Sequence, residues 1–191
     1  SATALYESNP NNPIFTYNGS TLYAANIKYI NEEKTDLSGF DISFESQTYI
    51  SQFGELNYKI DGSYLIEYET TQSGTSIDRA GRFNYDIEGY SLPEFKLNLF
   101  ATMQNNFNKY TFNARYISGY DNFKSLSGRA KSIGGYSNEV DSSLMLDLGY
   151  KLYLKNNDIE YNLSFSILNL TDEEPPKVNR QPEFSYDPRQ I

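Results

Sequence analysis

Residues 159–167 read Ile-Glu-Tyr-Asn-Leu-Ser-Phe-Ser-Ile, and this stretch decides the fold class. Every odd position from Ile159 to Ile167 is apolar, and every even position between them is polar. A period of two without a break places the apolar side chains on one face of a β-strand. The preceding stretch, from Leu144 to Leu154, repeats the pattern. We therefore predict two consecutive strands that share an apolar face.

Four earlier stretches show the same alternation. We predict strands over residues 21–49, bent or bulged near 31–34, and over 56–68, 83–103 and 110–118. No segment has a helical period. The fold class is therefore all-β, an antiparallel meander of about six long strands over 21–169. Residues 1–20 are predicted to form a loop because they are rich in Asn and Pro, and 170–191 a second, external loop.

The turns test this layout, because a hairpin must bring like faces together across the ladder. A turn at 155–158 would place Leu154 opposite Ile159. A turn at 51–55 would place Phe44 opposite Gly62, and one at 104–109 would place Met103 opposite Tyr110. All three turns predict one consistent apolar face.

Composition limits the function. The net charge of −9 argues against nucleic acid, which requires clustered Lys and Arg. The absence of His and Cys removes the commonest metal ligands and the usual catalytic imidazoles and thiolates. We expect no metal, no cofactor and no enzymatic activity. No run of about 18 apolar residues is present, so no transmembrane helix is predicted.

Strand length favours a membrane barrel. Strands of soluble proteins average about 5–6 residues, whereas a tilted strand needs about 9–11 to cross a bilayer. Short turns at one end, long polar connections at the other, and aromatic residues near the short turns are typical of outer-membrane barrels. The alternative is a soluble or surface-attached β-sandwich, in which the apolar face is core and the loops bind carbohydrate.

Several motifs resemble those of a known family. The segment Ser166-Ile-Leu-Asn-Leu-Thr-Asp-Glu-Glu-Pro-Pro176 resembles the Asn-Leu-Phe-Asp-x-x-Pro-Pro signature near the end of TonB-dependent outer-membrane receptors. Further matches follow in the same order as in that family: residues 37–42, 91–96, 116–120, 140–142 and 186–188. Thr171 departs from the pattern, because Phe is usual there.

The resemblance implies a fragment of a transport protein in the bacterial outer membrane. It implies a plug domain and further barrel strands ahead of this segment, a closing strand after it, and contact with TonB through the missing N-terminal part. Its partners would be outer-membrane lipid and a scarce small molecule such as a siderophore, cobalamin or an oligosaccharide. The polar positions of the strands, among them Lys96, Asn98, Arg115, Asp147 and Lys151, would face the plug and water. The predicted register sets Asn98 across from Arg115.

The loop over 118–139 holds the candidate ligand contacts. Aromatic and cationic residues lie there among three glycines, a mixture able to stack on a sugar or contact an anionic chelate. The candidates are Tyr120, Phe123, Arg129, Lys131 and Tyr136. The simpler interpretation is a polar loop that covers the end of the sheet.

Overall fold

The computed structural model describes residues 15–18, 21–25, 34–72, 74–84, 90–122, 137–156, 158–179 and 184–186, and these contain strands and turns but no helix. The chain divides into two compact units, Ser1–Glu33 and Lys34–Ile191. In the first unit, β1 (Phe15–Asn18) pairs with β2 (Thr21–Ala25) as an antiparallel hairpin.

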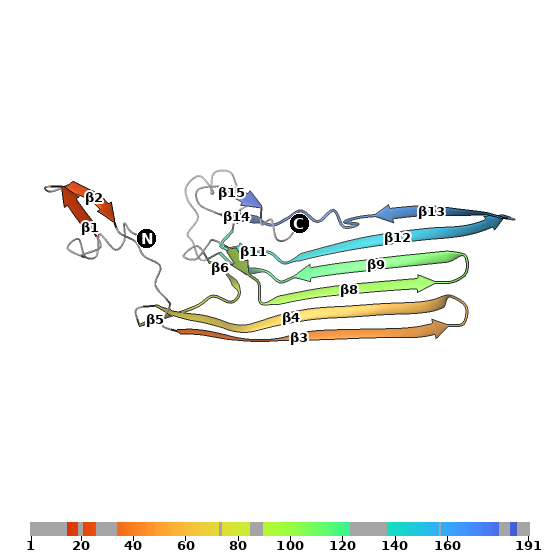
Figure 1. Cartoon of the computed structure of the whole chain (residues 1–191), viewed down its shortest axis with the longest axis horizontal. Coiled ribbons are helices and arrows are strands. Elements are labelled where there is room, and N and C mark those ends of the chain that lie inside the picture. The colour runs from red at the N-terminus through yellow and green to blue at the C-terminus, as the bar shows by residue number, and fades with distance from the viewer. Residues whose placement is uncertain are drawn as a thin grey trace. The chain divides into compact units, whose positions relative to one another are not determined.

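Six long strands of the second unit form one antiparallel sheet. They are β3 (Lys34–Ile50), β4 (Gly54–Gln72), β8 (Phe95–Gln104), β9 (Asn108–Ile117), β12 (Ser143–Asn156) and β13 (Ile159–Ile167). Their order across the sheet is β13-β12-β9-β8-β4-β3, so each strand pairs with the next long strand along the chain (Figure 1). The predicted fold class, an all-β antiparallel meander of long strands, is confirmed. A short strand, β5 (Thr75–Asp78), pairs with the last part of β4.

The register separates the two faces as the alternation predicts. One row of directly opposed residues crosses five strands on the apolar face: Leu56, Met103, Tyr110, Tyr150 and Phe165. Within this row the rings of Tyr110 and Tyr150 are in contact, with centroids 5.2 Å apart. On the other face most positions are polar, although Phe100, Ile117 and Met145 also lie there.

One of the three predicted hairpin registers is confirmed, and two are wrong by one pair of residues. Met103 lies opposite Tyr110 as predicted. Ile42, however, lies opposite Gly62, and Phe44 opposite Ile60. In the last hairpin Leu154 lies opposite Tyr161. In both cases the ladder continues further toward the turn than predicted, to Ile50–Gly54 and to Asn156–Ile159. Shortening a turn by two residues preserves parity, so the apolar face is unchanged.

Two predicted strand boundaries are also wrong. Within the strand expected over 21–49, Thr21–Ala25 pairs with Phe15–Asn18, and β3 begins at Lys34; residues 26–33 lie outside the described chain. Asn18-Gly19 is a strong hairpin signal between two such runs, so residues 15–18 are a strand and not part of a loop. The strand expected over 83–103 is interrupted before β8, where Pro93 cannot donate to a ladder.

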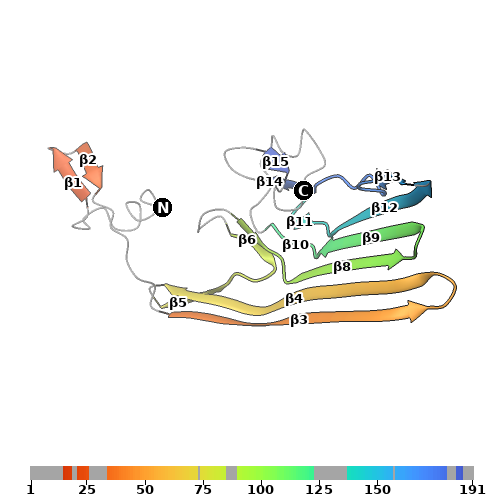
Figure 2. The same cartoon turned by 45° about the vertical axis from the view of Figure 1, so that its right-hand side comes forward.

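The interrupted segment contributes to a small second sheet. Its strands are β6 (Arg82–Asn84), β7 (Tyr90–Leu92), β10 (Tyr120–Asp121) and β11 (Glu139–Val140), in the order β11-β10-β6-β7. Figure 2 shows β6, β10 and β11 beyond those ends of β8, β9 and β12 that lie away from the short turns. Strands β14 (Lys177–Asn179) and β15 (Phe184–Tyr186) form a further antiparallel pair within the stretch expected to be an external loop.

The buried core is formed by residues of the small sheet and of β14, and not by the large sheet. Phe83, Tyr120, Val140 and Val178 form a cluster in which each side chain is at most 5% exposed. Among the described residues, no hydrophobic side chain of the six long strands reaches that degree of burial. The large sheet therefore has no apolar core on either face within the described chain.

Gly54 provides a test of the first hairpin. Its φ is +100°, and a Cβ there would overlap the carbonyl oxygen of Gln104 on β8. We expect Gly54→Ala to lower the free energy of unfolding by about 2–4 kcal/mol, from backbone strain and overlap together. Urea unfolding followed by far-UV circular dichroism would measure the loss.

Gly74→Ala is the matched control, because Gly74 has a φ of +77° but no atom of the described chain lies within 4 Å of the place that a Cβ would take. It should cost only about 1 kcal/mol, the conformational part of the effect. Equal losses in the two variants would contradict the close approach at Gly54.

Candidate functional site

The apolar face is the most extensive functional feature of the described chain. Large apolar side chains of β3, β9, β12 and β13 are exposed on it, including Phe165 at 65%, Ile42 at 56% and Phe40 at 51%. Soluble monomers rarely expose contiguous apolar patches larger than a few hundred Å². A sheet with this face requires another apolar phase against it, either a second protein layer or lipid.

A hollow of about 450 Å³ lies among these side chains. Apolar residues of five neighbouring strands line it, among them Leu56, Met103, Phe112, Leu148 and Ile167. Ala101, opposite both Tyr58 and Phe112, is the small residue at this place in the sheet. The hollow is part of the apolar face and not a separate polar binding site.

The polar face carries short-range ion pairs. Lys59 Nζ lies 2.7 Å from Asp61 Oδ2, and Ser43 Oγ donates to Asp61 Oδ1 at 2.7 Å. Lys155 Nζ lies 3.2 Å from Glu160 Oε1 across the last hairpin. Asn98 lies opposite Arg115, as predicted. Most of these groups are exposed, so each pair contributes little to stability by itself.

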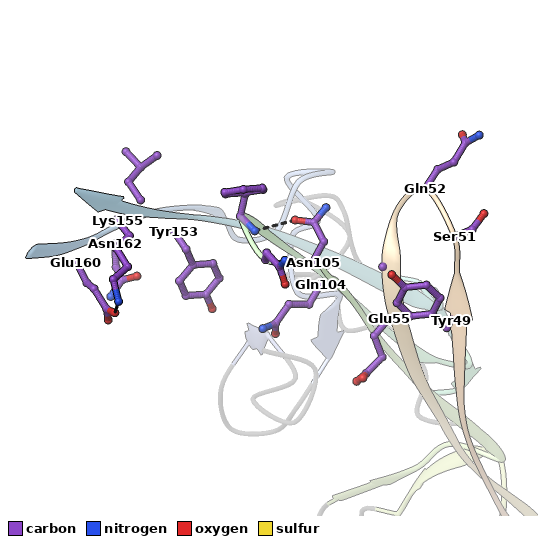
Figure 3. Close-up of a pocket in the computed structure, with 14 residues that line it drawn as sticks. Tyr49, Ser51, Gln52, Glu55, Gln104, Asn105, Tyr153, Lys155, Glu160 and Asn162 are labelled. Carbon is purple, nitrogen blue, oxygen red and sulfur yellow. Dashed lines mark hydrogen bonds and ion pairs between the residues drawn. The ribbon is translucent and has the colours of Figure 1, made fainter. Parts of the chain in front are cut away.

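A larger hollow, of about 790 Å³, lies beside the short turns. Figure 3 shows its polar lining residues: Glu55 and Tyr49 from the first hairpin, Gln104 and Asn105 from the second, and Tyr153, Lys155, Glu160 and Asn162 from the third. Asn105 orders the middle turn, since its Oδ1 accepts the backbone N–H of Phe107 at 2.9 Å. The hollow offers amide, hydroxyl and carboxylate groups but no convergent catalytic set.

Asp147 anchors the turn that follows β13. Its Oδ1 accepts the backbone N–H of Asn169 at 2.9 Å. Its Oδ2 accepts Asn113 Nδ2 at 3.0 Å and pairs with Arg115 Nη2 at 3.2 Å. The side chain of Asp147 is only 16% exposed, so these contacts are partly shielded from water. One carboxylate therefore connects β9, β12 and the Asn-Leu-Thr-Asp turn.

The turn itself is built by Asn169. Its φ is +51°, a left-handed conformation that Asn tolerates. Its Oδ1 accepts the N–H of Glu173 at 2.9 Å, while its Nδ2 donates to the Glu173 carbonyl oxygen at 3.0 Å. Thr171, where the receptor signature has Phe, donates from Oγ1 to the Leu144 carbonyl oxygen at 3.3 Å. The motif is thus a structural stop for β13.

The structure places one of the predicted ligand residues. Tyr120 is 5% exposed, and its ring lies 6.5 Å from that of Phe83 in the core of the small sheet. Buried there, it has little surface for a ligand. Phe123, Arg129, Lys131 and Tyr136 lie outside the described residues, and their role stays a prediction.

A third hollow, of about 490 Å³, borders the small sheet and contains the carboxylates of Glu94, Asp121, Glu139 and Asp141. Within the described ranges, no group of three or more His, Cys, Asp or Glu residues is placed to hold a metal ion. No helix in the described part of the chain has the length and hydropathy to span a membrane. Comparison with protein-family models, with characterised proteins and with solved structures gave no match.

The anchor at Asp147 leads to a prediction. Asp147→Ala should leave the Asn169 N–H, Asn113 and Arg115 without their shared acceptor and lower the free energy of unfolding by about 1–3 kcal/mol. Amide hydrogen exchange at residues 169–173 should accelerate, because the turn loses its connection to β12. Hydrogen exchange read by mass spectrometry would measure this directly.

Asp61→Ala is the control, since Asp61 also accepts a hydroxyl and pairs with a lysine but receives no hydrogen bond from this turn. It should leave exchange at 169–173 unchanged. If both variants loosen the turn equally, the anchor described for Asp147 is refuted.

Proposed function

We propose that this chain is a segment of the barrel wall of a TonB-dependent outer-membrane receptor, which takes up a scarce ligand by an energised mechanism. The observation that supports this most is the large sheet whose apolar face has no protein layer against it among the described residues. Lipid is the apolar phase that such a face would meet.

Strand length and turn placement support the same proposal. Strands β8 and β9 are 10 residues long and β12 is 14, enough for a tilted strand to cross a bilayer. The three hairpin turns between long strands are short, whereas the connections that contain the small sheet are long. In this proposal the short turns face the periplasm and the small sheet lies outside, near the ligand.

Six strands are too few for a closed membrane barrel, because the smallest have about 8. The free edges of β3 and β13 would leave backbone groups unpaired in lipid. The proposal therefore includes further strands that complete the barrel and a plug domain against the polar face. The ligand would be a small molecule, such as a siderophore, cobalamin or an oligosaccharide.

Neighbouring residues on β8 test the membrane location. Leu99 lies on the apolar face, and Phe100, whose side chain is 46% exposed, lies on the polar face. The sequence has no Cys, so single Leu99→Cys and Phe100→Cys variants can carry one spin label each. In phosphatidylcholine vesicles, oxygen should relax the label at 99 and a water-soluble nickel chelate the label at 100. Lipid on one face and water on the other would produce this alternation.

The opposite result would support the β-sandwich with carbohydrate-binding loops. In that case the protein would not associate with vesicles, and the label at 99 would be protected from both reagents by a second protein layer. Equal access of the nickel chelate to both positions would contradict a lipid-facing apolar surface.

A further inference from the structure

Two lysines face each other on the polar side of the large sheet. Lys109 on β9 lies directly opposite Lys151 on β12. Side chains in this relation have Cβ atoms about 4.5–5.5 Å apart, and like charges so placed repel each other. Within the described chain, neither lysine forms one of the ion pairs found on this face. Lys151 Nζ instead lies 5.0 Å from the centroid of the Tyr153 ring.

The immediate surroundings of the pair are polar and free of carboxylates. Gln104 lies beside Lys109, and Ser164 beside Lys151, in the same cross-strand row. The next row contains Thr111, Gly149 and Ser166. Gly149 has no side chain, and Thr111 Cβ lies 3.4 Å from the place that a Cβ of Gly149 would take. Two ammonium groups, three hydroxyls and an amide thus surround one small area.

None of the nearest acidic residues forms an ion pair with Lys109 or Lys151 in the described chain. Asp147, four residues before Lys151, accepts from Asn169 and Asn113 and pairs with Arg115. Glu160 pairs with Lys155. Glu55, two strands from Lys109, accepts a hydrogen bond from Asn57 at 2.6 Å. No acid of these neighbouring strands neutralises the lysine pair, although the chain as a whole has a net charge of −9.

We propose that Lys109 and Lys151 bind an oxyanion, a phosphate or carboxylate group, over Gly149. The two ammonium groups would donate charge-assisted hydrogen bonds to it, and the hydroxyls of Thr111, Ser164 and Ser166 would complete its surroundings. The oxyanion could belong to a small solute or to an acidic side chain of a protein segment lying against this face. The inference rests on strand register and on the contacts of the neighbouring charged groups, and it does not require the membrane location.

Anion-dependent stability of the whole chain tests the proposal. At constant ionic strength, replacing chloride by inorganic phosphate should raise the thermal unfolding midpoint of the unaltered protein. Lys109→Gln and Lys151→Gln should each weaken phosphate binding, measured by isothermal titration, by about tenfold or more. Lys96→Gln, the loss of a lone lysine opposite Ser63 and Ile117, should leave the phosphate response intact.

A charge reversal provides an independent variant. Lys109→Glu places a carboxylate opposite Lys151 and so substitutes for the bound anion. Its unfolding midpoint without phosphate should exceed that of the unaltered protein, and phosphate should add nothing further. A phosphate response that is absent in the unaltered protein, or equal in Lys151→Gln and Lys96→Gln, would overturn the proposal.

Comparing small anions with an acidic peptide shows whether the bound oxyanion belongs to a small solute or to a protein segment. Stabilisation by phosphate and acetate alike indicates a site open to small solutes. A response to a short glutamate-rich peptide that exceeds the response to acetate at equal carboxylate concentration indicates a protein segment. Either result supports the site, and both should disappear in Lys151→Gln.

Discussion

The apolar face of the large sheet is the constraint on which the rest of the structure depends. A half-apolar sheet is stable in water only when a second layer removes that face from solvent. The buried cluster of Phe83, Tyr120, Val140 and Val178 contains no residue of the six long strands. The long ladders keep their apolar residues on one face over most of their length, with one register shift at Ser38/Gly39 in the β3–β4 pairing.

The alternation predicted the faces of this sheet but not its registers. The face that a side chain occupies depends only on whether its position in the strand is odd or even. The alternation therefore predicts the correct face for the apolar residues of each hairpin. Register depends on turn length, and a turn two residues shorter has the same parity. Gly54 continues the first ladder because it tolerates a φ of +100° close to Gln104, a contact with a strand that is about 50 residues distant in sequence. The residues next to Gly54 in the sequence give no indication that Gln104 lies against it.

In the candidate sites too, the sequence predicts local turn residues but not the contacts between distant parts of the chain. The Asn-Leu-Thr-Asp turn was recognisable from its residues, since Asn and Asp favour turns and Pro175 cannot extend a strand. Its anchor was not, because Asp147 lies 22 residues earlier and reaches Asn169 only through the β12–β13 pairing. Lys109 was assigned to a turn, and only the continued ladder places it opposite Lys151. Tyr120 is a predicted ligand residue, and the sequence does not reveal that its side chain is only 5% exposed in the structure.

The polar face also has an order of its own. Its ion pairs, such as Lys59–Asp61 and Arg115–Asp147, are internally neutral and leave the remaining charges to set the local field. Asp41, Glu45 and Glu55 remain on β3 and β4, whereas Lys96, Lys109 and Lys151 remain on β8, β9 and β12. The face is thus acidic toward one edge and basic toward the middle. A segment or solute lying against it would be oriented by this gradient, with its negative groups directed to the lysine pair.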